Sequence, residues 1–182
     1  MTIAFMSFNI EEGRYIILGS IDGLLATLGI IIGVSVVSAS NSVIVSAALG
    51  GAIALALTNG VGSYLAESTI EHGKLAMTEK SLLRRLNNTY VESQSRRKIA
   101  KDALSSGGAS FIGSLVPLAP WIFSVGSVAA SVGLSLVSLV ALGVYAGYIS
   151  RQSYALSVVK MVALGALIVI AVQLLRISHL VQ

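Results

Sequence analysis

A single acidic residue lies within the first long apolar stretch of the chain. The stretch covers residues 15–37, YIILGSIDGLLATLGIIIGVSVV, and its one charged side chain is Asp22. About 20 mainly apolar residues span a bilayer as a helix, and a carboxylate within such a helix is unfavourable unless it faces protein, water or a cation. Two interpretations are open for Asp22: a structural hydrogen bond to a neighbouring helix, or a site for a cation or a proton.

Small residues share one face of this helix with Asp22. At 3.6 residues per turn, the other members of the face are Gly19, Ala26, Gly29 and Gly33. Small side chains let helices approach closely in a membrane. We therefore expect this face to pack against another helix.

A second set of polar residues follows in the next apolar segment. Its members are four positions apart, on one face of a helix: Asn59, Ser63, Glu67 and Glu71. One interpretation is hydrogen bonding between helices by Asn59 and Ser63, with both glutamates solvated. The other is an ion path or a set of ligands. The candidate metal ligands are therefore Asp22, Asn59, Glu67 and Glu71.

The third apolar segment contains both prolines of the chain, Pro117 and Pro120. Pro117 has no amide hydrogen to donate to the carbonyl of Gly113, and its ring loosens the helix at that point. Within a membrane, the freed carbonyl needs a partner, which a neighbouring helix or water can supply. Alternatively, the backbone near Gly113 and Pro117 coordinates a cation or acts as a gate, as in the broken helices of transporters.

The composition indicates the class of protein. Of the 182 residues, 55% are hydrophobic and 11% are charged, and the mean hydropathy is +0.87. Soluble domains have about 25% charged residues, so we predict an all-α polytopic membrane protein. The chain has no cysteine, which excludes disulfides and thiolate metal sites. It has no nucleophile with a base, metal-hydrolase spacing or phosphate loop, so we do not expect an enzyme.

The apolar and charged segments predict a single membrane domain with five transmembrane helices. The predicted spans are residues 15–37, 43–66, 103–123, 128–149 and 156–175, preceded by a short interfacial helix. Eight of the twelve basic residues lie in segment 67–102, which the positive-inside rule places in the cytoplasm. Leucine spacing and a capping box from Thr89 to Glu92 predict that this segment is a short helical hairpin.

Five crossings would leave the amino terminus in the cytoplasm and the carboxy terminus outside. The net charge of +4 has its explanation in this topology, because the basic residues adjoin the apolar spans. Nucleic acid is therefore not an expected partner.

The sequence resembles the vacuolar iron transporter (VIT) family, as a short, prokaryotic-type member. The resemblance covers nearly the whole chain and is carried by Asp22-Gly23-Leu24-Leu25, by the segment from Asn59 to Glu67, and by Gly107-Gly108 followed by Pro117 and Pro120. It implies a homodimer that exports ferrous iron, and often manganese, from the cytoplasm in exchange for protons. The metal ion is then a substrate, and no cofactor is implied. Asp22 would be a ligand in the translocation path.

The chain departs from this family at two positions of the second helix. Metal-transporting members commonly have methionine and glutamate where this chain has Asn59 and Ser63. Members also have a longer cytoplasmic metal-binding domain than the 67–102 segment allows. Oxygen ligands from Asp22, Asn59 and Glu67 would suit manganese or ferrous iron, and protonation of Asp22 would release the ion.

A different class of function stays open at this point. The chain could be a non-transporting scaffold or adaptor whose basic hairpin binds anionic membrane lipid or a partner protein. The residues that would make these contacts are Arg96, Arg97, Lys98 and Lys101.

Overall fold

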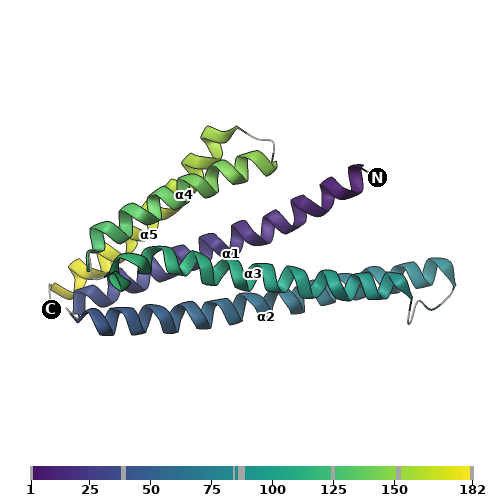
Figure 1. The fold of residues 1–182 in the computed structure, drawn as a ribbon, viewed down its shortest axis with the longest axis horizontal. Coiled ribbons are helices and arrows are strands. Elements are labelled where there is room, and N and C mark those ends of the chain that lie inside the picture. Colours follow the sequence, from purple (N-terminus) through teal and green to yellow (C-terminus); the bar gives the residue numbers. More distant parts are fainter. Residues whose placement is uncertain are drawn as a thin grey trace.

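The fold is a bundle of long α-helices. The computed structural model describes residues 2–37, 40–83, 85, 89–123, 126–150 and 153–180. For residues 2–12, 173 and 175–180 it describes the backbone alone. The helices in this part of the chain are α1 (Thr2–Val37), α2 (Asn41–Leu82), α3 (Tyr90–Ile122), α4 (Val128–Ser150) and α5 (Tyr154–Leu180). In Figure 1, α2 and α3 run along the length of the molecule, with α1 beside them and α4 and α5 on the far side of α1.

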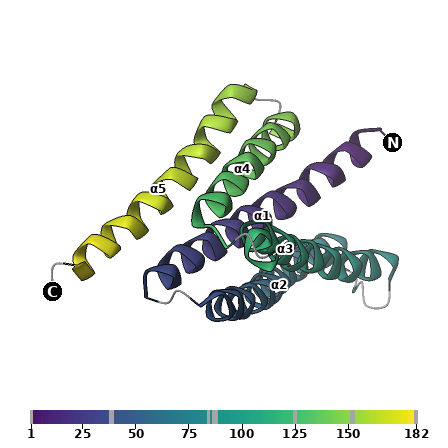
Figure 2. The same ribbon diagram turned by 60° about the vertical axis from the view of Figure 1, so that its left-hand side comes forward.

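Helix α3 packs closely against both α1 and α2 (Figure 2). Three serines on its buried side are spaced one turn apart: Ser106, Ser110 and Ser114. The hydroxyl groups of Ser110 and Ser114 donate to the backbone carbonyl four residues earlier, at 2.9 and 2.8 Å. The three serines lie on the side of α3 that packs against other helices, so their hydroxyl groups do not have to face lipid.

Four of the five helices in the described residues are long and apolar enough to cross a membrane. They are α1 over Gly13–Val37, α2 over Asn41–Leu82, α4 over Val128–Ser150 and α5 over Tyr154–Val172. Helix α3 does not meet this requirement, since serines, glycines and two prolines lower the hydropathy of its second half. The molecule is thus all-helical with four membrane-spanning candidates, and a fifth crossing by α3 remains a prediction.

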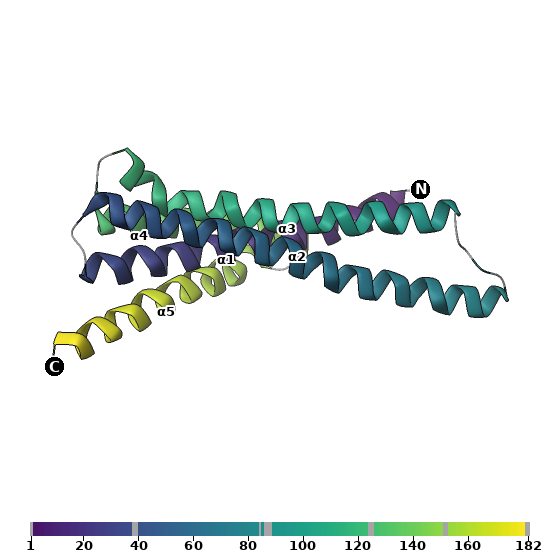
Figure 3. The ribbon, with the colours of Figure 1, turned by 90° about the horizontal axis from the view of Figure 1, so that it is seen from below.

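The helices are longer than the predicted spans. Helix α1 is continuous from Thr2, without a separate short helix before residue 15, and α2 continues past residue 66 to Leu82. The 42 residues of α2 measure about 63 Å along the helix axis, twice the ~30 Å of a hydrocarbon core. The carboxy-terminal end of α2 and the amino-terminal end of α3 extend past the end of α4 and the start of α5 (Figure 3).

The predicted capping box at the start of α3 is confirmed. Thr89 has extended backbone angles, and its side-chain oxygen accepts a hydrogen bond from the amide of Glu92 at 3.5 Å. This contact satisfies one of the amide groups that have no partner within the first turn of a helix. The sequence therefore sets the start of α3 locally.

Glycines allow the backbones of neighbouring helices to touch. A methyl group on Gly23 of α1 would overlap the carbonyl oxygen of Ser110, and one on Gly113 of α3 would overlap that of Ser20. Between α4 and α5, a methyl group on Gly143 would lie 2.7 Å from the Cα atom of Val158. The close approaches at Gly23 and Gly113 fix α1 on α3, and hence the position of Asp22 relative to α3.

The expected packing of the small-residue face of α1 is found at one end only. Gly19 contacts the backbone of α3 at Ser106. By contrast, a methyl group on Gly29 or Gly33 would have no atom of the described chain within 4 Å. This half of the face is therefore open in a single copy of the chain.

Candidate functional site: a carboxylate in a groove between helices

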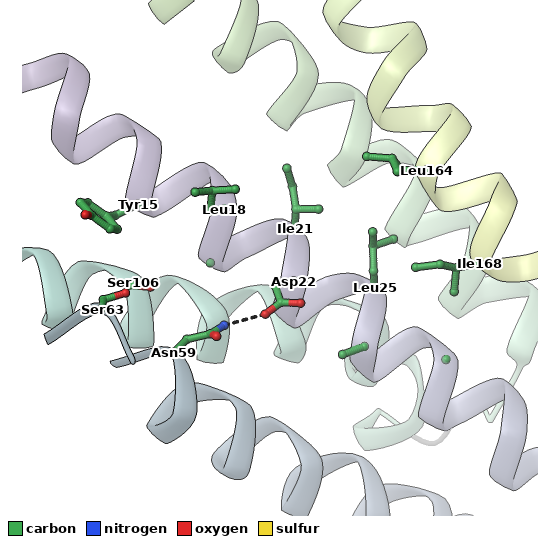
Figure 4. A pocket seen from close by; sticks show the side chains of 13 residues that line it. Tyr15, Leu18, Ile21, Asp22, Leu25, Asn59, Ser63, Ser106, Leu164 and Ile168 are labelled. Carbon is green, nitrogen blue, oxygen red and sulfur yellow. Dashed lines mark hydrogen bonds between the residues drawn. The ribbon is translucent and has the colours of Figure 1, made fainter. Parts of the chain in front are cut away.

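An open groove with a volume of about 750 Å³ surrounds Asp22. Helices α1, α2, α3 and α5 contribute to its walls (Figure 4). One wall is polar, with Asp22, Asn59, Ser63 and Ser106, and the opposite wall is apolar, with side chains such as Leu164 of α5. The polar wall thus provides carboxylate, amide and hydroxyl groups.

Asp22 lies well inside the apolar part of the bundle. Its helix can be aligned with α4, because Gly13 contacts the side chain of Ile149 near the end of α4. Asp22 follows Gly13 by nine residues, about 14 Å along a helix axis. The carboxylate is therefore inside the apolar segment Gly13–Val37 and not at its end.

Asn59 connects the carboxylate to α3. Its amide nitrogen Nδ2 donates to Oδ2 of Asp22 at 2.7 Å and to Oγ of Ser110 at 2.7 Å. Asp22 is exposed in the groove, Asn59 is half-buried, and Ser110 is fully buried. The two predicted site residues Asp22 and Asn59 are therefore brought into direct contact.

Glu67 belongs to a separate cluster that joins α2 to α1. It is 5% exposed and accepts a hydrogen bond from the hydroxyl group of Tyr15. The guanidinium group of Arg14 lies 3.8 Å from the same carboxylate and 4.9 Å from the centre of the Tyr15 ring. Tyr15 also lines one end of the groove, so this cluster borders the Asp22 site without containing it.

Glu71 joins α2 to α3. It is 7% exposed, and it receives hydrogen bonds from Lys74 at 2.9 Å, Lys98 at 3.3 Å and Ser95 at 3.2 Å. Two ammonium groups thus compensate one buried carboxylate. The expectation of solvated glutamates does not hold for Glu67 or Glu71, because both side chains pack between helices.

Gly113 and Pro117 lie at the buried side of α3. Gly113 contacts the backbone of Ser20, and Pro117 is fully buried. Helix α3 is continuous through both prolines to Ile122. A direct role of these two residues in gating or coordination remains a prediction.

The predicted ligands do not form one cluster within a single copy of the chain. Among the described residues, no three histidine or acidic side chains are close enough to hold one metal ion. Asp22 with Asn59 is one pair, while Glu67 and Glu71 have partners of their own. One chain thus offers the Asp22 carboxylate to an ion in the groove, with the amide group of Asn59 beside it.

Sequence reasoning missed two residues that organise this region, Tyr15 and Ser110. Tyr15 begins the first apolar stretch, where an aromatic residue is ordinarily assigned to the membrane interface. Ser110 belongs to the series Ser106, Ser110 and Ser114, and this spacing was a usable signal for a hydrogen-bonding face. Their partners depend on how the helices cross, which periodicity alone does not specify.

The helices and the groove define an integral membrane protein with a carboxylate accessible within its apolar region. A model of the VIT family matches residues 13–89 and 71–175. The uncharacterized protein MJ0645 of Methanocaldococcus jannaschii is 38% identical over 169 residues, covering 90% of this chain and 87% of that protein. The chain therefore belongs to the VIT family, which confirms the resemblance seen in the sequence. Members of this family are transporters rather than enzymes, and the membership indicates membrane transport of metal ions.

Proposed function

We propose that the protein exports a divalent metal ion, Fe²⁺ or Mn²⁺, from the cytoplasm in exchange for protons. The observation that carries this proposal is the position of Asp22, an exposed carboxylate in an intramembrane groove. It accepts a hydrogen bond from a neutral amide, that of Asn59, at 2.7 Å. Oxygen atoms of carboxylate, amide and hydroxyl groups suit hard and borderline divalent ions. Membership of the VIT family supports the same class of substrate.

Proton exchange follows if the ion and the proton share the carboxylate of Asp22. A carboxylate must be ionised to bind a metal ion, so the two compete for the same oxygen atoms. We expect the apparent KM for Mn²⁺ to rise as the pH on the loading side falls. Asp22 and Asn59 are the proposed ligands, and Glu67 and Glu71 are further candidates that already have cationic neighbours.

A homodimer would complete the coordination of the ion. Divalent ions such as Mn²⁺ prefer about six ligands, more than one pair of side chains provides. The open face of α1 at Gly29 and Gly33 is suited to the close approach of another helix, and a two-fold axis there would pair two copies of Asp22. Because the chain has no cysteine, oxidation of an Ala26→Cys variant is a specific test. We expect a disulfide-linked dimer, and cross-linking no faster than for an exposed position on α5 would contradict this interface.

Transport is tested in proteoliposomes with and without a proton gradient. Wild-type protein should take up Mn²⁺ or Fe²⁺ in a gradient-dependent way, and Asp22→Asn should reduce the flux at least about tenfold because it removes the charge that binds the ion. The matched control is Glu92→Gln, which removes a carboxylate that pairs with Arg96 near the start of α3. Its flux should equal that of the wild type. Absence of flux in folded wild-type protein for both metals would contradict the proposal.

The basic segment gives less support to the alternative of a lipid-binding scaffold. Arg96 is paired with Glu92 at 2.8 Å, and Lys98 is paired with Glu71 at 3.3 Å. These two cations therefore already have carboxylate partners within the chain. If removal of the charges on Arg97 and Lys101 abolished function while Asp22→Asn left it intact, the scaffold would be the better explanation.

A further inference from the structure

The hydrogen bonds around Asn59 determine which way its amide group faces. The Asp22 carboxylate can only accept when it is ionised. The hydroxyl group of Ser110 uses its hydrogen to donate to the carbonyl oxygen of Ser106 at 2.9 Å, so towards Asn59 it can only accept. Both neighbours at 2.7 Å are therefore acceptors, and the NH₂ side of the amide must face them.

This orientation places a donor where a cation would bind. In the structure, the amide nitrogen of Asn59 donates to Asp22 (Figure 4). The same nitrogen also donates to the hydroxyl oxygen of Ser110. A metal ion that binds the Asp22 carboxylate through Oδ2 has to displace that N–H group. The amide oxygen reaches the ion only if the amide turns, and turning breaks the hydrogen bond to Ser110.

We propose that Ser110 is a positioning residue that holds the Asn59 amide against Asp22 and thereby weakens cation binding at this carboxylate. The inference rests on the proposed function, because it assumes that the groove binds a divalent cation. Ser110 itself is fully buried, and its hydroxyl group contacts the Asn59 amide, so it acts through that amide. A transporter benefits from such an arrangement, since an ion that binds too tightly is not released.

Ser114 is a matched control for Ser110. Both serines are fully buried on the same side of α3, and both hydroxyl groups donate to the carbonyl one turn earlier. The second contact of Ser114 is the carbonyl oxygen of Gly23 at 3.1 Å, and not Asn59. Serine-to-alanine changes at the two positions remove the same atoms from equivalent environments.

The first measurement is Mn²⁺ binding to the purified full-length protein by electron paramagnetic resonance. Binding to the Asp22→Asn variant gives the signal from ions bound elsewhere, which is subtracted. We expect Ser110→Ala to bind Mn²⁺ about three- to tenfold more tightly than the wild type, the factor that one net hydrogen bond is worth. Ser114→Ala should bind like the wild type. A merely structural role of Ser110 would weaken binding instead. Weaker or unchanged binding in Ser110→Ala, or the same change in both variants, would overturn the proposal.

The second measurement does not require a metal ion. The chain has two aspartates, Asp22 and Asp102, so infrared spectra of protein labelled with ¹³C-aspartate contain two carboxylate signals, and Asp22→Asn assigns them. Ser110→Ala should shift the Asp22 band, while Ser114→Ala leaves it unchanged. If wild-type protein binds neither Mn²⁺ nor Fe²⁺, the proposed function fails, whereas an unchanged Asp22 band in Ser110→Ala overturns the role of Ser110.

Discussion

The acidic residue of the groove, Asp22, and two buried glutamates of helix α2 have different partners. Asp22 is exposed, and a neutral amide donates to it at 2.7 Å. Glu67 and Glu71 are buried and lie next to cationic groups, the guanidinium of Arg14 for Glu67 and the ammonium groups of Lys74 and Lys98 for Glu71. All three carboxylates occur in helices that contain long apolar segments. The sequence pattern therefore does not show that Asp22 differs from Glu67 and Glu71.

The difference determines what an arriving cation would displace. At Asp22, a cation replaces one hydrogen bond from an amide, whose net value is about 1 kcal/mol. At Glu71, a cation would have to displace ammonium groups and leave them without their carboxylate, which is strongly unfavourable in a partly buried place. A neutral partner thus keeps a carboxylate available, whereas a charged partner commits it to helix packing.

The largest effect is expected from a change that disrupts the groove while leaving the contacts of Glu71 in place. In Gly23→Ala, the added methyl group overlaps the backbone of Ser110, which cannot move aside as a side chain could. We expect a loss of about 3 kcal/mol in the free energy of unfolding, the upper part of the usual range for overpacking. Separation of α1 from α3 should also abolish Mn²⁺ flux. Unfolding in mixed detergent measures the first effect and proteoliposome flux the second.

Gly29→Ala is the control on the same helix. The added methyl group meets no described atom within 4 Å, and alanine favours a helix over glycine by up to about 1 kcal/mol. The stability of a single chain should therefore be unchanged or slightly higher. Equal destabilisation by both changes would show that the close approach at Gly23 is not what holds α1 on α3.

The sequence predicted the helices and one pair of the site, but not the partners of the glutamates. Asp22 and Asn59 stood out because polar residues are rare in apolar helices and the resemblance pointed to the same positions. Glu67 was predicted to share an ion path or face solvent, because helical spacing defines a face but not the residue opposite it. The contact with Tyr15 depends on where α1 crosses α2. Similarly, the serines spaced one turn apart in α3 lower its hydropathy but lie on its buried side, and which side is buried depends on the assembled bundle.

A smaller effect is expected when the charge of Glu71 is removed. Glu71→Gln leaves Lys98, whose side chain is 22% exposed, beside a neutral amide, while Lys74, at 58% exposed, can turn to solvent. We expect a loss of about 2 kcal/mol in the free energy of unfolding, less than for a fully buried ion pair. Mn²⁺ flux per folded molecule should stay close to that of the wild type, since the residues that line the groove are unchanged.

The same unfolding experiment on Glu92→Gln provides the control for Glu71→Gln. Glu92 pairs with Arg96, whose side chain is 73% exposed, so this ion pair should contribute at most about 0.5 kcal/mol. If Glu71→Gln lost flux in the way expected for Asp22→Asn, Glu71 would belong to the ion path, and the division between the two regions would be wrong.

The smallest change tests whether Glu67 belongs with Glu71 or with Asp22. Tyr15→Phe keeps the ring at the end of the groove but removes the hydroxyl group that donates to Glu67. The same hydroxyl group accepts a hydrogen bond from Arg14 at 3.0 Å, which is lost as well. We expect a loss of about 1.5 kcal/mol in the free energy of unfolding for the two hydrogen bonds, while Tyr148→Phe at an exposed position should have no effect.

Flux then separates the two assignments of Glu67. If Glu67 only joins α1 to α2, Mn²⁺ flux in Tyr15→Phe should remain close to the wild-type value. If Glu67 is a metal ligand whose carboxylate is occupied by the hydrogen bond from Tyr15, removal of the hydroxyl group makes the carboxylate available to the ion. The KM for Mn²⁺ should then fall several-fold. A lower KM that disappears in the double variant Tyr15→Phe with Glu67→Gln would place Glu67 on the ion path. The groove would then extend from Asp22 to the level of Arg14, and only Glu71 would remain a purely structural acid.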